Sequence, residues 1–135
     1  MLLTLSVLAP LLAAPVAWWL VRTTGERIAS WFWLLPALLF TGYAGLLPTV
    51  LDGQARVESW DWIPSLGVAF ALRADGLSLL FALLISGIGA FIFLYAARYL
   101  AGHADLGRFY ARLILFMAVM LGAVLADDFM TLLVF

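Results

Sequence analysis

Long apolar stretches separated by short polar ones dominate the pattern of the chain. The first runs over residues 2–21 without a charged side chain, and three more cover residues 29–51, 76–98 and 109–126. A helix rises about 1.5 Å per residue, so about 20 residues cross a hydrocarbon layer about 30 Å thick. The pattern therefore predicts an all-α membrane protein with four transmembrane helices.

A polar loop is predicted at residues 52–74, between the second and third helices. Charged side chains return there, and apolar residues alternate with small or charged ones over residues 67–73. An alternation of period two is typical of a strand. Residues 57–64 can pair with it through a turn that contains Pro64 and Gly67, so we expect a short β-hairpin on the membrane surface.

The last residues predict the start of a fifth helix. Asp127 and Asp128 interrupt the apolar pattern, and residues 129–135 are apolar again apart from one threonine. Seven residues of helix reach only about 10 Å, a third of a membrane crossing. We therefore expect an incomplete fifth helix over residues 129–135.

The first apolar stretch has a rival interpretation as a cleaved signal peptide. Small residues around Pro15 resemble a cleavage site. However, no positive charge precedes the stretch, and its 20 residues exceed the usual apolar core of about 7–15. A retained transmembrane helix is the interpretation we favour.

Composition supports an integral membrane protein and excludes several functions. The 135 residues are 67% hydrophobic and 11% charged, against about 45–50% and 25% in soluble domains. The net charge of −1 leaves no basic surface for nucleic acid, and the absence of cysteine excludes disulfides and iron–sulfur clusters. With one histidine and no catalytic or phosphate-binding motif, the sequence predicts no metal site, no cofactor and no enzymatic activity.

The distribution of arginines predicts the orientation. Five arginines fall in the first and third connections or their flanks, and two in the loop at residues 52–74; the five are Arg22, Arg27, Arg98, Arg108 and Arg112. Short cytoplasmic loops carry the excess of positive charge in membrane proteins. We therefore expect a multi-pass protein of the cell membrane with its N-terminus, hairpin and Asp127–Asp128 turn outside the cytoplasm.

Four ionisable residues are candidates for an ion path, because charge is costly within a membrane. Asp75 precedes the third helix, where it can cap the helix or lie on an ion path. Arg112 lies one turn inside the fourth helix, where it can reach the interface or face a hydrated cavity. Asp127 and Asp128 are about 100° apart if helical, so we expect one to cap the fifth helix and the other to meet water or a neighbouring subunit. His103 is expected to be a solvated loop residue, with pH sensing as the alternative.

Small residues recur at helical spacing on the third and fourth helices. The two sets are Ser78, Ala82, Ser86 and Ala90, and Ala118, Gly122 and Ala126. Small side chains let membrane helices approach closely. The spacing predicts helix–helix contacts within a bundle.

Residues 60–135 resemble a known family. The similarity lies in "WIPSLG", "RADGLSLLFALLI", "FYARLILFM" and "GAVLAD". These motifs are similar to the amino-terminal region of the A-type subunit of the Mrp-type multisubunit cation/proton antiporters, a family related to the antiporter-like membrane subunits of respiratory complex I. The first two spans match this family only in position and hydropathy.

The resemblance implies a large, many-helix subunit with an outward N-terminus that assembles with other membrane subunits to exchange Na+ for H+. In this family the glutamate of the proton route lies in a Trp-Glu-Leu-Thr-Ser segment that follows the position of Phe135. It acts with lysines and histidines of later helices, and none of these can be assigned to this sequence. Only Asp75 and Asp128 match positions where the family has acidic or neighbouring polar residues. We therefore expect a fragment that contributes to the membrane scaffold and is inactive alone.

Two alternatives stay open. The chain could be the start of a complex I antiporter-like subunit, which belongs to a redox-driven proton pump, or a small membrane assembly or scaffold protein. The codons after Phe135 would distinguish a short natural protein from a fragment, and the neighbouring genes would distinguish an antiporter from complex I.

Overall fold

Long helices and one pair of strands make up the structure. This computed structural model describes residues 1–63, 68–100 and 105–135, apart from the side chains of Glu26, Trp62, Ile63 and Val68. The elements are α1 (Leu2–Thr24), the 3-10 helix η1 (Glu26–Trp31), α2 (Leu34–Ala44), α3 (Leu47–Leu51), β1 (Arg56–Ile63), β2 (Val68–Ala74), α4 (Gly76–Tyr99), α5 (Leu106–Leu125) and α6 (Phe129–Val134). The predicted turn at Pro64 and Gly67 and the loop residue His103 lie outside the described residues.

Four helical segments of the described chain are long and apolar enough to cross a membrane. They are Leu2–Thr24, Arg27–Leu51, Gly76–Tyr99 and Leu106–Leu125. A two-stranded antiparallel hairpin separates the second from the third, and α6 begins a further helix. The predicted fold class is thus confirmed, and the chain is a multi-pass membrane protein.

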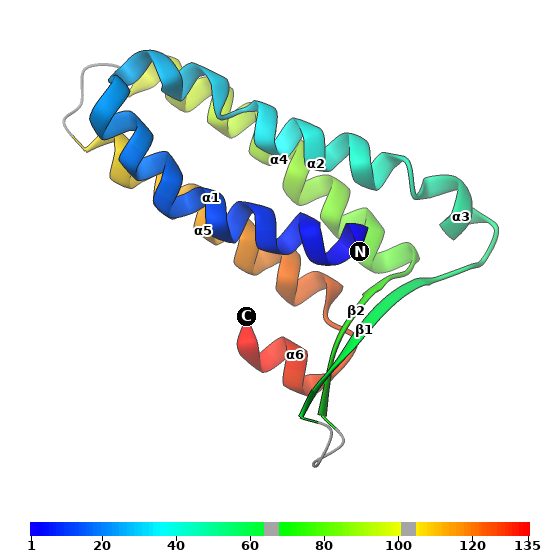
Figure 1. Cartoon of the computed structure of the whole chain (residues 1–135). Helices are drawn as coiled ribbons and strands as arrows, with labels where there is room; N and C mark the ends of the chain where they lie inside the picture. Colours follow the sequence, from blue (N-terminus) through cyan, green and yellow to red (C-terminus); the bar gives the residue numbers. More distant parts are fainter. Residues whose placement is uncertain (64–67, 101–104) are drawn as a thin grey trace.

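The helices pack as two adjoining pairs. Helix α1 lies along α5, α2 lies along α4, and α4 also contacts α5 (Figure 1). At Gly107 of α5 an added Cβ would lie 3.3 Å from the Trp18 carbonyl oxygen of α1, so the two backbones approach closely there. The hairpin and α6 lie together at one end of the bundle, which we call the hairpin end (Figure 1).

The second span is interrupted, and its prolines account for the breaks. It consists of η1, α2 and α3 rather than one continuous helix. Pro36 lies in the first turn of α2 and Pro48 in the first turn of α3. Because the first turn of a helix needs no backbone N–H, proline is better accommodated there than in a helix interior.

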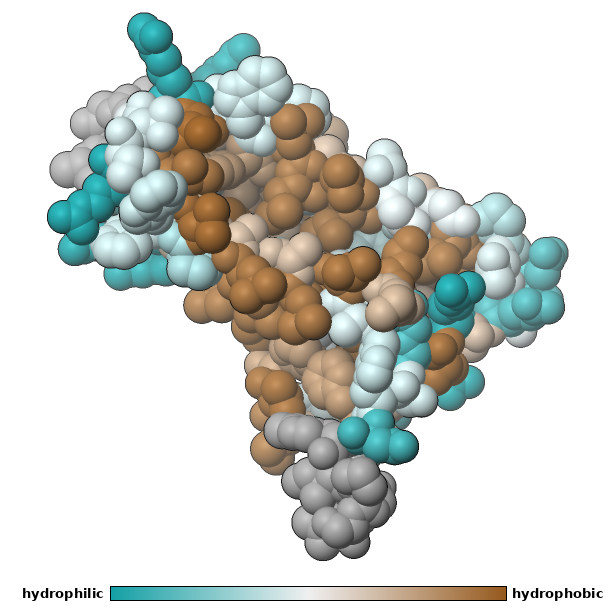
Figure 2. All heavy atoms as spheres, viewed as in Figure 1, coloured by the Kyte–Doolittle hydropathy of each residue, from teal (hydrophilic) through white to brown (hydrophobic). Residues whose placement is uncertain are grey.

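Buried side chains form two clusters along the bundle. Leu3, Tyr43, Leu72 and Leu125 belong to the cluster at the hairpin end. The other cluster surrounds Tyr110 and lies near the end that carries Arg22, Arg27, Arg98, Arg108 and Arg112, which we call the arginine end. Figure 2 shows apolar residues over the middle of the bundle and hydrophilic residues towards its ends, as expected for a membrane-spanning segment.

The small residues of α4 and α5 differ in burial. Ala82, Ser86, Ala118 and Gly122 are buried, whereas Ser78, Ala90 and Ala126 are half-buried. The Ser86 hydroxyl donates to the Ala82 carbonyl oxygen at 2.6 Å, so this buried polar group is satisfied within its own helix. A Cβ at Gly122 would overlap the ring of Phe135, the residue that follows α6, so a larger residue at position 122 requires that ring to move.

The hairpin confirms the strand prediction and fixes which residues face the bundle. Trp60 pairs with Phe70, and Glu58 pairs with Leu72, in an antiparallel register that becomes irregular between Asp61 and Ile63. Leu72 is fully buried. Since residues paired across two strands share a face of the sheet, Glu58 is also directed toward the bundle.

Candidate functional site

The ion-path candidates lie at opposite ends of the bundle. Asp75, Asp127 and Asp128 flank helix termini at the hairpin end, whereas Arg112 lies on α5 near the arginine end. They therefore do not form one site. Their individual contacts show what each can do.

Asp75 caps α4. Its Oδ1 accepts a hydrogen bond from the backbone N–H of Ser78 at 2.9 Å, and its backbone is extended, as expected for a residue that precedes a helix. The hydrogen bond from Ser78 lowers the pKa of Asp75 below its usual value, against the opposing effect of desolvation. The predicted capping role is confirmed, and the carboxylate is held in its charged form.

Asp127 and Asp128 have different contacts, and the predicted cap of the last helix is confirmed for Asp128, whereas Asp127 pairs with a residue of its own chain. Asp128 caps α6, because its Oδ1 accepts from the backbone N–H of Thr131 at 2.6 Å. Asp127 instead forms an ion pair with Arg73 of β2, with an Nη1–Oδ1 distance of 3.2 Å. Such partly exposed pairs contribute about 0–1 kcal/mol, so this contact orients the turn more than it stabilises it.

Glu58 is a buried carboxylate that the sequence analysis did not single out. It is 7% exposed and is the only charged side chain among the described residues that is buried. Its Oε2 accepts from the backbone N–H of Thr4 at 3.1 Å and from the Thr4 hydroxyl at 2.9 Å, and its Oε1 pairs with the N-terminal ammonium of Met1. Glu58 thus joins the hairpin to the beginning of α1.

These contacts keep Glu58 ionised although it is buried. Burial alone would raise the pKa of Glu58, but the ammonium group and the Thr4 donors outweigh it and lower the pKa to about 2. The alternation of residues in the two strands could have indicated that Glu58 is buried. Leu72 is an apolar residue of the alternating segment, so the residue paired with it across the hairpin had to face the bundle as well.

A second polar link joins the hairpin to α6. Thr131 is 1% exposed, and its hydroxyl oxygen accepts from the backbone N–H of Ala71 at 2.9 Å. The backbone N–H of Asp127 donates to the Ala71 carbonyl oxygen at 3.0 Å. Strand β2 is therefore fastened by its backbone to the α5–α6 turn, a contact that no local sequence pattern predicted.

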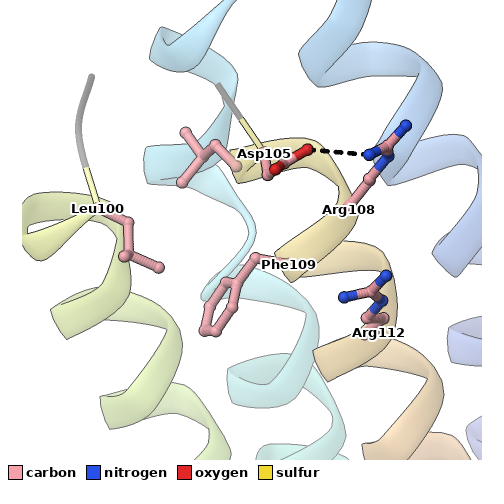
Figure 3. A pocket seen from close by; sticks show the side chains of 6 residues that line it. Leu100, Asp105, Arg108, Phe109 and Arg112 are labelled. Atoms are coloured by element: carbon pink, nitrogen blue, oxygen red, sulfur yellow. Dashed lines mark hydrogen bonds and ion pairs between the residues drawn. The ribbon is translucent and has the colours of Figure 1, made fainter. Parts of the chain in front are cut away.

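Arg112 lines a pocket of mixed apolar and charged character at the arginine end (Figure 3). The pocket has a volume of about 300 Å3 and is lined by Leu100, Asp105, Leu106, Arg108, Phe109 and Arg112. Arg108 pairs with Asp105 at 3.1 Å, and both side chains are exposed. Within residues 1–63, 68–100 and 105–135, no hydrogen bond or ion pair engages the Arg112 guanidinium.

The spans themselves carry polar groups that are already satisfied. The Tyr43 hydroxyl donates to the Ser6 hydroxyl at 2.7 Å, and the Ser6 hydroxyl donates to the Leu3 carbonyl oxygen at 2.6 Å. The Tyr110 hydroxyl donates to the Phe93 carbonyl oxygen at 3.1 Å. These bonds link α1 to α2 and α5 to α4, so they serve packing.

The spans hold no carboxylate, and the described residues form no metal site. Neither aspartate nor glutamate occurs within the four spans. Among the residues that the structure describes, no three His, Cys, Asp or Glu side chains are grouped so that they could hold a metal ion. A proton relay through a membrane needs embedded titratable groups. The charged side chains of these spans are all arginines toward the arginine end: Arg22, Arg27, Arg98, Arg108 and Arg112.

Comparison with known proteins identifies relatives over nearly the whole chain. Residues 60–110 match the family model of the N-terminus of chain 5 of NADH-ubiquinone oxidoreductase (complex I). The chain is 40% identical to the A1 subunit of the Na(+)/H(+) antiporter of Staphylococcus haemolyticus and equally to that of Staphylococcus aureus, over 99% of its own length and 17% of theirs.

A solved structure agrees with these relatives. One chain of the Mrp complex from Dietzia sp. superimposes with a TM-score of 0.80 at 34% identity, over 99% of this chain and 14% of that chain. The similarity includes the first two spans, which the sequence motifs alone did not cover. The chain is thus similar to the A1 subunits of Na(+)/H(+) antiporters, and it spans 17% of the length of the curated relatives it matches.

Proposed function

We propose that this chain forms the first helices of the A-type subunit of a multisubunit cation/proton antiporter, and that it acts there as scaffold. The complete assembly exchanges Na+ for H+, while this part holds the helices beside the ion path. The observation that carries the proposal is a fold shared over 99% of the chain with the Mrp complex, combined with four spans that lack any carboxylate. It acts as part of a transporter and performs no enzymatic step.

The ion-path candidates are better explained as structural residues. Asp75 and Asp128 each accept a bond from a helix N-terminus, and Asp127 is engaged by Arg73. A carboxylate that carries protons must release these partners in every cycle. We infer that these three residues hold helix ends in place while the ion path runs through other parts of the assembly.

The lipid bilayer and other membrane proteins of the assembly are the partners expected from the exposed surface. Large apolar side chains face outward along the spans, including Leu12, Phe91 and Phe116 at 70%, 75% and 62% exposure. Exposed apolar surface of this extent is stable only in lipid or against other membrane helices. The net charge of −1 does not favour nucleic acid as a partner, because nucleic acid binding depends on an excess of positive charge.

The proposed orientation places the arginine end in the cytoplasm and the hairpin end outside. The absence of cysteine makes a direct test available, because a single introduced thiol is the only reactive one. Gln54→Cys, next to the hairpin, should react with a membrane-impermeant maleimide added to intact cells. Ser30→Cys, an exposed position beside Arg27, should react only after permeabilisation. The opposite pattern of labelling would contradict the orientation.

Copurification from native membranes tests the proposed assembly. An affinity-tagged form of the protein, expressed at its natural level, should retain the other proteins of a cation/proton antiporter. The match of residues 60–110 to a complex I family model makes membership of complex I the second candidate. Recovery of NADH dehydrogenase proteins instead would favour that candidate, and recovery of neither set would refute both.

A further inference from the structure

Two hollows lie along α5, each partly lined by α4 or its end. The first is the pocket at the arginine end that contains Arg108 and Arg112. The second is an apolar groove of about 190 Å3 nearer the middle of the bundle. Its walls include Leu84, Ile88 and Ile92 from α4, and Leu113, Phe116 and Met120 from α5.

The two hollows share one face of α5. Lining residues of both hollows form one stripe along that helix, because successive members are neighbours in sequence or lie three or four residues apart. These residues are Phe109, Arg112, Leu113, Phe116 and Met120. Arg112 lies one turn from Phe116. A bound molecule that crosses both hollows therefore meets positive charge first and apolar surface next, over about 12 Å between Arg112 and Met120.

The pocket at the arginine end offers positive charge to an anion. Among the described residues, Arg108 is engaged only by the exposed carboxylate of Asp105, and no acceptor engages Arg112. Two arginines against one aspartate leave a net positive charge in the pocket. Arg22 in the last turn of α1, Arg27 in η1 and Arg98 in the last turn of α4 add to this charge at the same end of the bundle.

The groove is open at the surface of the chain, and Gly89 contributes no side chain to its α4 wall. Leu84 and Ile88 are each 51% exposed, and Phe116 is 62% exposed. A Cβ at Gly89 would lie 3.4 Å from the Met117 sulfur, so the floor of the groove is at contact distance from α5. An acyl chain fits such a groove, since it needs apolar surface and no hydrogen-bond partner.

We propose that this α4–α5 groove binds an anionic phospholipid of the leaflet at the arginine end. Its phosphate lies between Arg108 and Arg112, and one acyl chain follows Phe109 and Leu113 into the apolar groove. A phospholipid places its anion at the depth of the arginines and its chain at the depth of the groove, whereas a packed helix would need an acidic residue at one defined position. Basic pockets between membrane helices bind anionic headgroups for the same electrostatic reason.

Native mass spectrometry of the full chain in detergent, with added phosphatidylglycerol or phosphatidylcholine, tests the charged half of this site. We expect the double variant Arg108→Gln/Arg112→Gln to retain phosphatidylglycerol about thirtyfold less strongly, because two arginine–phosphate contacts are lost. Arg22→Gln, which removes a charge from the same end on α1, is the matched control and should retain the lipid. Circular dichroism should show the same helix content in all three proteins.

Three results would overturn the proposal. Equal retention of phosphatidylglycerol by the wild type and the double variant would exclude the arginine pair. An equal loss in Arg22→Gln would indicate diffuse attraction to the arginine end and no defined site. Equal competition by phosphatidylcholine would show that the groove does not select an anion.

A photocrosslinking amino acid at Phe116, in cells that make the complete complex, tests the apolar half. We expect a crosslink to lipid, visible as incorporation of labelled phospholipid. A crosslink to a protein of discrete size, without lipid, would identify the groove as a contact between helices and would refute the lipid site.

Discussion

Removing the charge of the buried Glu58 carboxylate should lower the stability of the folded protein. Glu58→Gln keeps the size of the side chain and an oxygen that can accept from Thr4, but it removes the charge that pairs with the Met1 ammonium. The pKa of Glu58 is about 2 against an ordinary 4.5. At about 1.4 kcal/mol per pH unit, the native contacts of the charged form contribute about 3 kcal/mol.

The pH dependence follows from the direction of this difference. Because the pKa of Glu58 is lower in the folded state than in the unfolded state, its contribution is complete above about pH 4.5. It is lost as the pH falls from there toward 2. Thermal unfolding of the wild type in nanodiscs should therefore show a decrease in midpoint over this range that the Glu58→Gln variant lacks.

Hydrogen–deuterium exchange at pH 7 measures the size of the effect directly. About 3 kcal/mol corresponds to about a hundredfold faster exchange of the β1 and β2 amides in Glu58→Gln. Asp61→Asn is the matched control, because Asp61 is an exposed carboxylate of the same strand. If exchange in Glu58→Gln equals that of the wild type, or if Asp61→Asn accelerates it equally, the assigned role of Glu58 is wrong.

Three further substitutions test the packing at the hairpin end. Thr131→Val should destabilise the protein by about 1–3 kcal/mol, because the buried β2 amide loses its acceptor, and thermal unfolding in nanodiscs would report this as a lower midpoint. Gly122→Leu should release α6 from α5 and increase its proteolysis, whereas Gly42→Leu, where the space beyond the backbone is open, should not. Asp75→Ala should cost about 1 kcal/mol of stability through loss of the α4 cap, and Asp75→Asn should restore most of it, as measured by the same unfolding assay.

The sequence predicted the elements whose pattern is repetitive. Unbroken apolar stretches indicated the spans, because lipid leaves a spanning segment few alternatives to a helix. The period-two alternation that includes Phe70 and Leu72 indicated the hairpin. Aspartates before helices indicated the cap at Asp75 and a cap by one of Asp127 and Asp128, which the structure assigns to Asp128. These features depend on neighbours within a few residues, which are visible in one sequence.

Contacts between distant residues were harder to predict. Glu58 and Thr4 are 54 positions apart, and Ala71 and Thr131 are 60 apart, so only the packed fold brings them together. The breaks in the second span also depend on packing, because proline is compatible with either a kinked helix or a new helix start. The sequence indicated Arg112 as an isolated candidate for an ion path. Its pocket could not be predicted, because it forms only where Arg108 and the end of α4 come together in the fold.

Ion flux in reconstituted vesicles tests the central claim of a scaffold beside an ion path most directly. Vesicles that contain only this chain, loaded with a pH-sensitive dye, should show no Na+-dependent proton movement, because the four spans carry no carboxylate. Vesicles that contain the complete antiporter assembly should show it under the same gradient. Na+/H+ exchange by this chain alone would contradict the account.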